Sequence, residues 1–536
     1  MNKLKQKNGA QAFFSAMVDA GITDCFANPG TSEMQLVYEM GLTDDIQPVL
    51  CLQENVVTGA CDGYNRMSEK PALALLHMGA GFANGLCNLH NARKAGSGMV
   101  VLCGDNADYH YRSVEHTMLT PIKHLAEAAA DFIKQTKSAD DLAVTGAQAA
   151  RIAKIGQGKI AVVTASTNHH WEPTTVSVKA TDPEPLNIVT DETIERVKTL
   201  LTNGKRSAIV LDKRCLIHGL EIAGQIAAAT GVEVMVPTIT PRFPRGEGRV
   251  IAKQIPYVPE LAFETLKDIE QMILLGTDFP ATSFAYQEKP IVKIPESCEV
   301  FIMATSENDT LDAFNRLGEI IGTTDAKKVK RQERVEFDIP AGSITPEALA
   351  QSLCNLIPEN AIVVDESATL GMTVFEETNG ARKHDWLMNP SGGGIGAGLP
   401  CALGAAVASP DRKILALQAD GCGMYTPQTL WSIARTNCDM TIVILKNDKY
   451  AILQIELARV RESEPTDKMT SMLDIDKPSI DWVKMAESQG IPATSATTVE
   501  EFQKQLAEAL AHKGPRLIEA CIDQDMGPMM AMVARQ

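Results

Sequence analysis

Residues 415–453, LALQADGCGMYTPQTLWSIARTNCDMTIVILKNDKYAIL, decide the fold. A strand pattern ends at Asp420, a helical pattern follows, and a second strand pattern ends at Asn447. Strands joined by a helix lie parallel, so we expect both ends at one edge of a sheet, where open α/β sheets bind ligands. An Asp-Gly pair alone is usually a turn. A carboxylate and a carboxamide at this spacing, however, suit a hard cation such as Mg²⁺ that also holds phosphates.

The same alternation of strand and helix patterns runs through three blocks of the chain, which predicts an α/β fold with three doubly wound parallel sheets. Predicted strands cover 24–27, 49–51, 72–76, 99–103 and 159–164, then 207–211, 232–236, 272–275 and 300–303, then 361–364, 413–417, 441–446 and 516–520. Proline-rich and charged stretches at 171–186 and 323–338 are typical of linkers. The predicted domains are 1–175, 188–322 and 341–536.

Composition excludes several classes of protein. The 536 residues allow three or four domains. An apolar fraction of 45% with 22% charged residues is that of a soluble globular chain. Lys and Arg number 50 and Asp and Glu 67, giving a net charge of −17, which argues against non-specific binding to nucleic acid or to a membrane surface.

The cysteines and the N-terminus predict a cytoplasmic location. The twelve cysteines are scattered without a C-x-x-C pair, so we expect small buried apolar side chains in a reducing compartment. No apolar run is long enough to span a membrane. Residues 1–21 predict a capped amphipathic helix and not a signal peptide.

A second motif is the glycine-rich run 390–398, PSGGGIGAG, before a predicted helix at 399–408. Gly392, Gly394 and Ala397 satisfy a G-x-G-x-x-A pattern, so a nicotinamide or flavin dinucleotide site is one alternative. The preceding segment, HDWLMNPS, is predicted to be irregular and not a strand, which disfavours that alternative. Another alternative is that the run only forms a tight start for the helix and binds no ligand.

A third feature is Glu54, where a buried strand pattern gives way to a helix at 54–66. A carboxylate at a helix start is commonly only a favourable partner of the helix dipole. A carboxylate set against an apolar strand would also suit proton transfer.

Together these residues resemble the thiamine diphosphate (ThDP) enzymes of the acetohydroxyacid synthase, pyruvate oxidase and benzoylformate decarboxylase type, in a branch similar to acetolactate synthase large subunits. The resemblance covers nearly the whole chain. It implies a pyrimidine-binding domain, a central domain and a pyrophosphate-binding domain in that order. It also implies a Mg²⁺ ion held by Asp420, Asn447 and the main-chain oxygen of Lys449.

The resemblance also implies the cofactor contacts. Glu54 matches the glutamate that activates the aminopyrimidine ring, and Ile395 matches the bulky residue that holds ThDP bent. The implied cofactor-binding residues are Asn28, Pro29, Gly30, Thr31, Glu54, Gly393, Ile395, Gly421, Cys422, Tyr450 and Ala451.

The chain departs from the family pattern at three places. Gly-Asp-Gly is Ala419-Asp420-Gly421 and Asn-Asn is Lys446-Asn447, changes that remove no metal ligand. Glu456 stands where biosynthetic acetohydroxyacid synthases usually carry a tryptophan, which puts standard branched-chain biosynthesis in doubt. The central segment shows no glycine-rich flavin signature, so we expect no FAD.

The implied reaction is decarboxylation of a 2-oxo acid to an enamine, which then gives an aldehyde or a 2-hydroxy ketone. One alternative is an acetolactate synthase-type transferase that condenses two pyruvates. Others are a ThDP-fold protein that only binds, against which Glu54 argues, and a nicotinamide dehydrogenase. In the family the cofactor lies between two subunits, so the resemblance implies a homodimer or homotetramer.

Histidines supply the remaining candidates. His77 follows a predicted strand and is either structural or, as the resemblance implies, a proton-transfer group. His116 is a second candidate from the next loop. The implied substrate pocket holds Thr31, His77, Ile452 and Glu456. His169 and His170 are predicted to be linker residues. The segment GTDFPATSFAYQ lacks the histidine of the benzoylformate branch, so benzoylformate is not the assumed substrate. The Met-rich tail, MGPMMAMV, is expected either to lack order or to cover the cleft.

Overall fold

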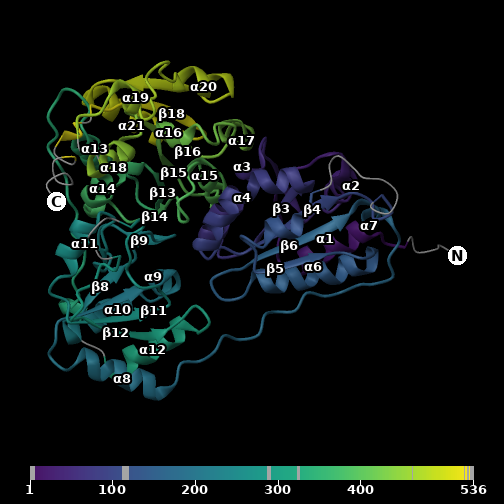
Figure 1. Cartoon of the computed structure of the whole chain (residues 1–536), viewed down its shortest axis with the longest axis horizontal. Helices are drawn as coiled ribbons and strands as arrows, with labels where there is room; N and C mark the ends of the chain where they lie inside the picture. Colours follow the sequence, from purple (N-terminus) through teal and green to yellow (C-terminus); the bar gives the residue numbers. More distant parts are fainter. Residues whose placement is uncertain are drawn as a thin grey trace.

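The computed structural model describes residues 6–110, 120–285, 291–322, 326–460, 463–523, 525–527 and 530. In these residues three sheets are built almost entirely of parallel strands with helices on their faces, which confirms the predicted α/β class. The N-terminal sheet lies apart from the other two, and the chain crosses from it to the central sheet in a long extended segment (Figure 1).

The N-terminal sheet has the strand order β2-β1-β3-β4-β6-β5, with all pairs parallel. Its strands are β1 (Asp24–Asn28), β2 (Gln47–Leu50), β3 (Ala72–His77), β4 (Met99–Asp105), β5 (Phe132–Gln135) and β6 (Ile160–Ser166). Its helices are α1 (Gly9–Asp19), η1 (Thr31–Glu33), α2 (Met34–Gly41), α3 (Glu54–Ser68), α4 (Met78–Lys94), α5 (Ile122–Ala126), α6 (Ala139–Ala153) and α7 (Thr167–Trp171). The inner strands are apolar and buried on both faces, as parallel sheets require.

The central sheet has the parallel order β10-β8-β7-β11-β12. Its strands are β7 (Ser207–Leu211), β8 (Glu233–Val236), β10 (Lys253–Gln254), β11 (Gln271–Leu275) and β12 (Glu299–Ala304). The helices around it are α8 (Asp191–Leu201), α9 (Lys213–His218), α10 (Leu220–Thr230), α11 (Pro259–Leu266), α12 (Thr310–Ile321) and η2 (Ala326–Lys328).

The third sheet has the order β17-β18-β16-β15-β13-β14-β9. Its strands are β13 (Ala361–Glu366), β14 (His384–Met388), β15 (Ile414–Ala419), β16 (Met440–Lys446), β17 (Ala493–Ala496), β18 (Arg516–Cys521) and the antiparallel β9 (Phe243–Arg245). Its helices are α13 (Pro346–Leu356), η3 (Ala368–Leu370), α14 (Gly371–Glu377), η4 (Thr378–Gly380), α15 (Gly398–Ala408), α16 (Asp420–Gly423), α17 (Thr429–Thr436), α18 (Ala451–Val460), α19 (Asp467–Thr470), α20 (Trp482–Ser488) and α21 (Val499–Ala511).

Two sequence-based predictions of structure were wrong. The segment predicted to be irregular before the glycine-rich run contains β14, which pairs with β13 and β9. Its His384 and Asp385 look like loop residues, but both are buried where β9 covers the sheet edge. His169 and His170 are not linker residues, because they form α7 at the end of β6 and are almost fully buried.

Helices α3 and α15 join the N-terminal sheet to the third sheet by direct backbone contact. A side chain at Gly63 would overlap the carbonyl of Cys401, and one at Gly404 would overlap the carbonyl of Ala60. A Cβ atom at Gly59 would lie 2.6 Å from Pro400. Glycine is therefore required on both helices, and their contact holds the two sheets in one fixed arrangement.

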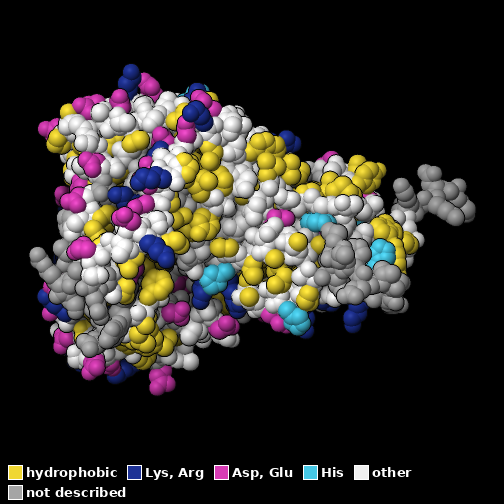
Figure 2. All heavy atoms as spheres, turned by 45° about the horizontal axis from the view of Figure 1, so that its top comes forward, with side chains coloured by type: hydrophobic (Ala, Val, Ile, Leu, Met, Phe, Trp, Pro, Cys, Tyr) yellow, Lys and Arg dark blue, Asp and Glu magenta, His cyan; other side chains and the backbone are white. Residues whose placement is uncertain are grey.

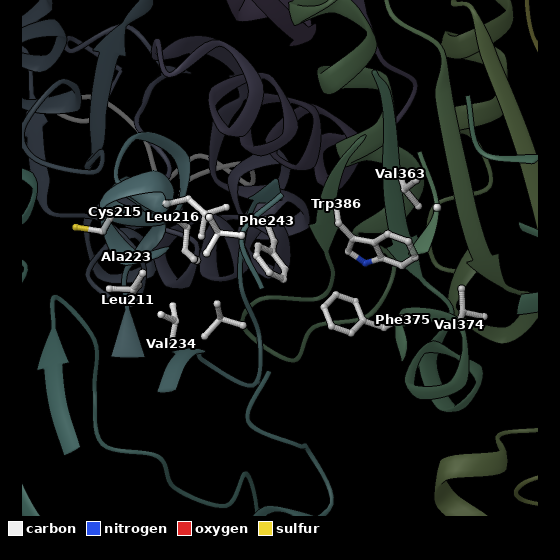
Figure 3. Packing of buried hydrophobic residues seen from close by; sticks show 14 of the residues in the cluster. Leu211, Cys215, Leu216, Ala223, Val234, Phe243, Val363, Val374, Phe375 and Trp386 are labelled. Carbon is white, nitrogen blue, oxygen red and sulfur yellow. The ribbon is translucent and has the colours of Figure 1, made fainter. Parts of the chain in front are cut away.

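A continuous apolar core joins the central and third sheets. Figure 3 shows Phe243 of β9 lying between Leu216 on one side and Phe375 and Trp386 on the other. The Phe375 and Trp386 rings meet edge to face with centroids 5.6 Å apart. β9 therefore belongs to the third sheet in space, although its residues lie within the central segment of the sequence.

The composition predicts a surface without a basic binding face and cysteines that are buried and free of disulfide bonds. The face in Figure 2 mixes acidic, basic and apolar side chains without a large field of Lys and Arg. All twelve cysteines are free thiols and ten are buried, the exceptions being Cys87, which is exposed, and Cys521, which is half-buried. Among the described residues, none of the helices is both long and apolar enough to cross a membrane.

Candidate functional site

Glu54 and His77 both border Gly81 at the carboxyl edge of the N-terminal sheet. Glu54 is the first residue of α3, and its Oε2 accepts a hydrogen bond from Asn84 Nδ2 at 3.1 Å. His77 ends β3 and caps α4. A Cβ atom built on Gly81 would lie 3.0 Å from Glu54 Oε1 and 3.4 Å from the Cβ atom of His77. Because Gly81 has no side chain, the two groups can approach each other.

The Asn-Pro-Gly corner packs on the same histidine. β1 ends at Asn28, which pairs with Leu76 of β3, so the corner follows directly beside His77. A side chain at Gly30 would overlap the imidazole ring, so the Gly30 backbone lies flat against it. Thr31 begins η1 and is exposed at this edge. The structure therefore brings together the N-terminal candidates Asn28, Pro29, Gly30, Thr31, Glu54 and His77.

Asp420 and Asn447 meet at the carboxyl edge of the third sheet, as their strand positions predict. Asp420 Oδ2 accepts hydrogen bonds from the amides of Asn447 at 3.2 Å and Asp448 at 2.8 Å, and Oδ1 accepts one from Gly421 at 2.8 Å. Burial raises the pKa of Asp420 above its ordinary value, although these hydrogen bonds lower it. A nearby cation would favour the ionised form of this buried carboxylate.

The neutral side chain of Asn447 lies at the same edge as Asp420. The Asn447 carboxamide oxygen accepts from the Lys449 amide at 3.2 Å, which folds the loop back on itself and keeps Lys449 at the same edge. Among the described residues, no cluster of three or more His, Cys, Asp or Glu side chains could hold a metal ion. A cation at Asp420 would therefore depend on amide and main-chain oxygens and on oxygens of a ligand.

The other residues predicted near the diphosphate surround the same loop. A Cβ atom at Gly421 would lie 2.6 Å from the Tyr450 ring, so only glycine allows this contact. Cys422 is buried, and burial raises the pKa of its thiol well above the ordinary value, so it is a neutral packing group and not a nucleophile. Ala451 begins α18 directly after Tyr450.

The glycine-rich turn before α15 is held from two sides. Gly393 and Gly396 have φ angles of 85° and 90°, which glycine adopts without strain. The buried Glu366 carboxylate, at the end of β13, accepts hydrogen bonds from the amides of three consecutive residues at 2.9–3.0 Å, namely Gly396, Ala397 and Gly398. Burial raises the pKa of Glu366 even so. Ile395, at the middle of the turn, remains half-buried.

From the other side, α4 of the N-terminal sheet reaches the same turn. Asn91 Oδ1 accepts from the Gly392 amide at 3.0 Å, and Asn91 Nδ2 donates to the Gly394 carbonyl at 2.7 Å. Asn88 Nδ2 donates to the Gly396 carbonyl at 3.3 Å. The position of Ile395 therefore depends on both sheets.

The predicted substrate residues on α18 lie beside the central sheet. The Oε1 atom of Glu456, a predicted substrate residue, lies 3.5 Å from Arg459 Nε. Arg459 also binds Glu260 of α11 at 2.7 Å. Burial, with Glu456 nearby, raises the pKa of Tyr257. Ile452 packs partly against the Met526 cluster, so the start of the Met-rich tail contacts α18.

Sequence reasoning missed Glu33, Glu366 and Asn91, which hold the candidate residues in place. Glu33 had a signal, since it stands three residues after Gly30 at the start of η1, where an acidic side chain commonly binds the free amides of a helix start. Glu366 and Asn91 had none, because their partners lie far away in sequence. His116 and the end of the Met-rich tail lie outside the described residues.

Both outer parts of the chain match family profiles of known proteins. Residues 7–134 match the family profile "Thiamine pyrophosphate enzyme, N-terminal TPP binding domain", and residues 369–520 match "Thiamine pyrophosphate enzyme, C-terminal TPP binding domain". A Mycobacterium tuberculosis protein named "Putative acetolactate synthase large subunit IlvX" is 37% identical over 97% of this chain and 100% of its own length.

More distant relatives match along nearly the whole chain. Benzoylformate decarboxylase of Pseudomonas aeruginosa is 25% identical over 93% of this chain and 96% of its own length. The solved structure of the Rhodococcus jostii ThDP-dependent 4-hydroxybenzoylformate decarboxylase superposes with a TM-score of 0.83 at 22% identity, covering 97% of this chain and 100% of the other.

Proposed function

Because this chain belongs to the thiamine pyrophosphate enzyme family, which confirms the resemblance noted in the sequence, we propose that it is a ThDP- and Mg²⁺-dependent enzyme that decarboxylates a 2-oxo acid. The remaining carbonyl fragment is then released as an aldehyde or joined to a second carbonyl compound. The observation that carries the proposal is that Glu54 and His77 both border Gly81, which places a carboxylate residue and a histidine at one ligand-binding edge.

The residues at the two sheet edges fit the two ends of the cofactor. At the third sheet, Asp420 with the Asn447 carboxamide and the Lys449 main-chain oxygen would hold Mg²⁺, which supplies the positive charge that a diphosphate needs in an acidic chain. At the N-terminal sheet, Glu54 would bind the aminopyrimidine ring. ThDP, when bound, supplies the nucleophilic carbon and accepts the electron pair that remains when CO₂ leaves.

The chain's own groups then position the reactants and move protons. Glu54 is a carboxylate at a partly exposed helix start, so it can share a proton with a ring nitrogen. His77 borders the same glycine, Gly81, and its side chain is 23% exposed, so it can transfer a proton to or from the substrate. Thr31 and Ile452 complete the proposed substrate pocket with His77 and Glu456.

The dinucleotide alternative conflicts with the hydrogen bonds of the glycine-rich turn. In a dinucleotide-binding turn, the free amides at the helix start bind the pyrophosphate. Here the amides of residues 396–398 are bound to the Glu366 carboxylate, which would repel an anion. Although β14 supplies the preceding strand that the sequence did not suggest, the amides that a pyrophosphate needs already have partners.

The central sheet supports the prediction that the enzyme uses no FAD. A nucleotide would bind at the carboxyl ends of β7 and β11. At that edge Asp212 accepts hydrogen bonds from Gln157 and Thr310, both at 2.8 Å, and a Cβ atom at Gly276 would lie 2.5 Å from its Oδ2. Lys213 donates to main-chain carbonyls at the end of α4, the shortest contact being 2.8 Å to Gly96. We propose that this edge binds the N-terminal sheet and not a nucleotide.

An acetolactate synthase-type reaction is the second candidate, since the 37% identical relative carries that name. A protein that only binds ThDP is disfavoured, because binding alone would not need Glu54. We further propose domains at 1–175, 188–322 and 341–536, a homodimer or homotetramer with active sites between subunits, and a cytoplasmic location.

The proposal is tested with the purified protein, ThDP and Mg²⁺ against a panel of 2-oxo acids. CO₂, aldehydes, 2-hydroxy ketones and acetolactate are all measured, because the product separates simple decarboxylation from the transferase reaction. Release of CO₂ from at least one acid, dependent on ThDP, is expected. An absorption band near 450 nm in the purified protein would contradict the absence of flavin, and failure with the whole panel would contradict the proposed activity.

A further inference from the structure

Glu33 is a fully buried carboxylate that the proposed reaction does not yet use. Its Oε2 lies 2.7 Å from His77 Nδ1 and accepts from the Gly30 amide at 2.9 Å, and its Oε1 accepts from the Ser32 hydroxyl at 2.7 Å. The buried charge is thus compensated by three partners. Ser32 Oγ also lies 3.2 Å from His77 Nδ1, and since its one hydrogen is donated to Glu33, it can only accept there. Both oxygens at Nδ1 are therefore acceptors, and Nδ1 carries the hydrogen.

This contact determines the chemistry that is left to His77. With the hydrogen fixed on Nδ1, only Nε2 can take up or release a proton. No hydrogen bond to Nε2 occurs among the described residues, and the side chain is partly exposed. The Gly30 backbone against one ring face and Glu33 at Nδ1 together fix the plane of the imidazole.

Resting on the proposed function, we propose that Glu33 is a positioning residue that holds His77 in the Nδ1-protonated tautomer and stabilises the imidazolium formed when Nε2 takes up a proton. Gly104 of β4 provides the space for this carboxylate, because any side chain at Gly104 would overlap Glu33 Oε1. Two strands and the η1 turn therefore build the pair of the buried Glu33 and the partly exposed His77. Glu54 and Asp105 are the other acidic groups close to this buried cluster.

The first test compares Glu33→Gln and Glu33→Leu by steady-state kinetics on the best 2-oxo acid. Gln can still accept from Nδ1 but carries no charge, so kcat should fall about 10-fold, whereas Leu removes the contact and should lower kcat about 100-fold. KM should change less than twofold, because Glu33 does not touch the substrate. Glu39→Gln, a buried carboxylate on the adjacent α2, is the matched control and should leave kcat unchanged.

A double-mutant cycle separates positioning from a merely structural role. In a His77→Asn background, Glu33→Gln should lower kcat no further if Glu33 acts through His77. An equal further loss in that background would overturn the proposal. If the Glu33 variants do not fold, Gly104→Ala gives the same test without removing the carboxylate, since the added methyl group displaces it from His77.

The third measurement does not depend on turnover. The ¹⁵N chemical shifts of His77, assigned by His77→Asn in histidine-labelled protein, report which ring nitrogen carries the hydrogen. We expect the Nδ1-protonated form in the wild type and a mixture of tautomers in Glu33→Leu. Identical shifts in the two proteins would overturn the positioning role. A protein that shows the expected tautomers but decarboxylates nothing would contradict the proposed function alone.

Discussion

Asn91 binds Gly394 with both ends of its carboxamide: Nδ2 donates to the Gly394 carbonyl at 2.7 Å, and Oδ1 accepts from the Gly394 amide at 3.2 Å. Asn91 belongs to the helix that begins beside His77, whereas Gly394 precedes the residue proposed to bend the cofactor. One helix therefore links the proton-transfer groups of the N-terminal sheet to the glycine-rich turn of the third sheet.

Asn91→Ala should weaken ThDP binding about 10-fold or more. It removes three hydrogen bonds to the turn, each worth about 1 kcal/mol. Without them Ile395 is held less firmly, and we expect part of the lost free energy to appear as weaker ThDP binding. The dissociation constant is measured by calorimetry at saturating Mg²⁺. Asn355→Ala, which also removes two side-chain bonds to a backbone segment but lies elsewhere, should leave the affinity unchanged. Equal affinities of Asn91→Ala and wild type would refute this role.

Glu54→Gln should bind ThDP nearly as tightly as the wild type but lower kcat about 100-fold or more, because a carboxamide can donate a hydrogen bond but cannot exchange a proton with the ring. ThDP titration and product formation are measured on the same preparation. Glu69→Gln, at the other end of α3, is the control. Full activity of Glu54→Gln would contradict the assigned role.

Asp420→Asn should abolish Mg²⁺-dependent ThDP binding. An asparagine Nδ2 would face the amide donors that now bind the carboxylate, and the only proposed charged metal ligand would be lost. ThDP affinity is measured over a range of Mg²⁺ concentrations, with Asp439→Asn at the opposite end of β16 as control. Tight ThDP binding that does not respond to chelation of the metal would be inconsistent with this site.

Glu456→Gln should change substrate preference toward 2-oxo acids with an anionic tail. Removing one negative charge at a partly buried position lowers the repulsion of an anion by about 1 kcal/mol, or about fivefold in relative kcat/KM. The ratio of kcat/KM for a dicarboxylic and a neutral 2-oxo acid is compared with that of Glu264→Gln on the exposed side of α11. A ratio that stays constant across the panel would sink the hypothesis that Glu456 faces the substrate.

The pH dependence of stability should carry a contribution from His384. Burial, and then Arg245, lower the pKa of His384 to about 3, below the value of about 6.5 expected in the unfolded chain. The unfolded state thus binds the proton more readily, so the contribution is complete above pH 6.5 and is lost as the pH falls toward 3. The slope is up to about 1.4 kcal/mol per pH unit.

His384→Phe should reduce that slope, because it removes the titrating group from the same buried position. Thermal unfolding midpoints between pH 7 and pH 4.5 provide the measurement. His124→Gln, at an exposed position, should retain the wild-type dependence. The same slope in His384→Phe and wild type would show that other groups control the acid transition.

Sequence patterns predict most of the fold because buried parallel strands are short continuous apolar runs. β7 occupies the predicted residues 207–211, and β16 differs from its prediction by one residue. Strands that contain polar residues are not predicted in this way, because they form no continuous apolar run. β5 reads FIKQ at a sheet edge. β14 reads HDWLM, in which the buried Asp385 binds Arg242, a partner far away in the sequence, and the buried His384 bonds to the nearby Arg382 carbonyl.

The candidate site divides in the same way. Residues at strand ends, such as Asp420 and Asn447, follow from the topology, since parallel strands place their carboxyl ends together. Glu366 and Asn91, which hold the glycine-rich turn, bind residues about 30 and 300 positions away in the chain. A single sequence does not show which distant residues come into contact.

The glycine contact between α3 and α15 also limits how this protein can be re-engineered. Cofactor enzymes are often recombined by exchanging whole domains between relatives. Here there is no room for a side chain at Gly63 or Gly404, so an N-terminal domain taken from a relative must carry glycine at the position of Gly63. In a chimaera the two outer domains should therefore come from proteins whose α3 and α15 helices fit each other. The donor is best chosen by this helix contact and not by overall sequence identity.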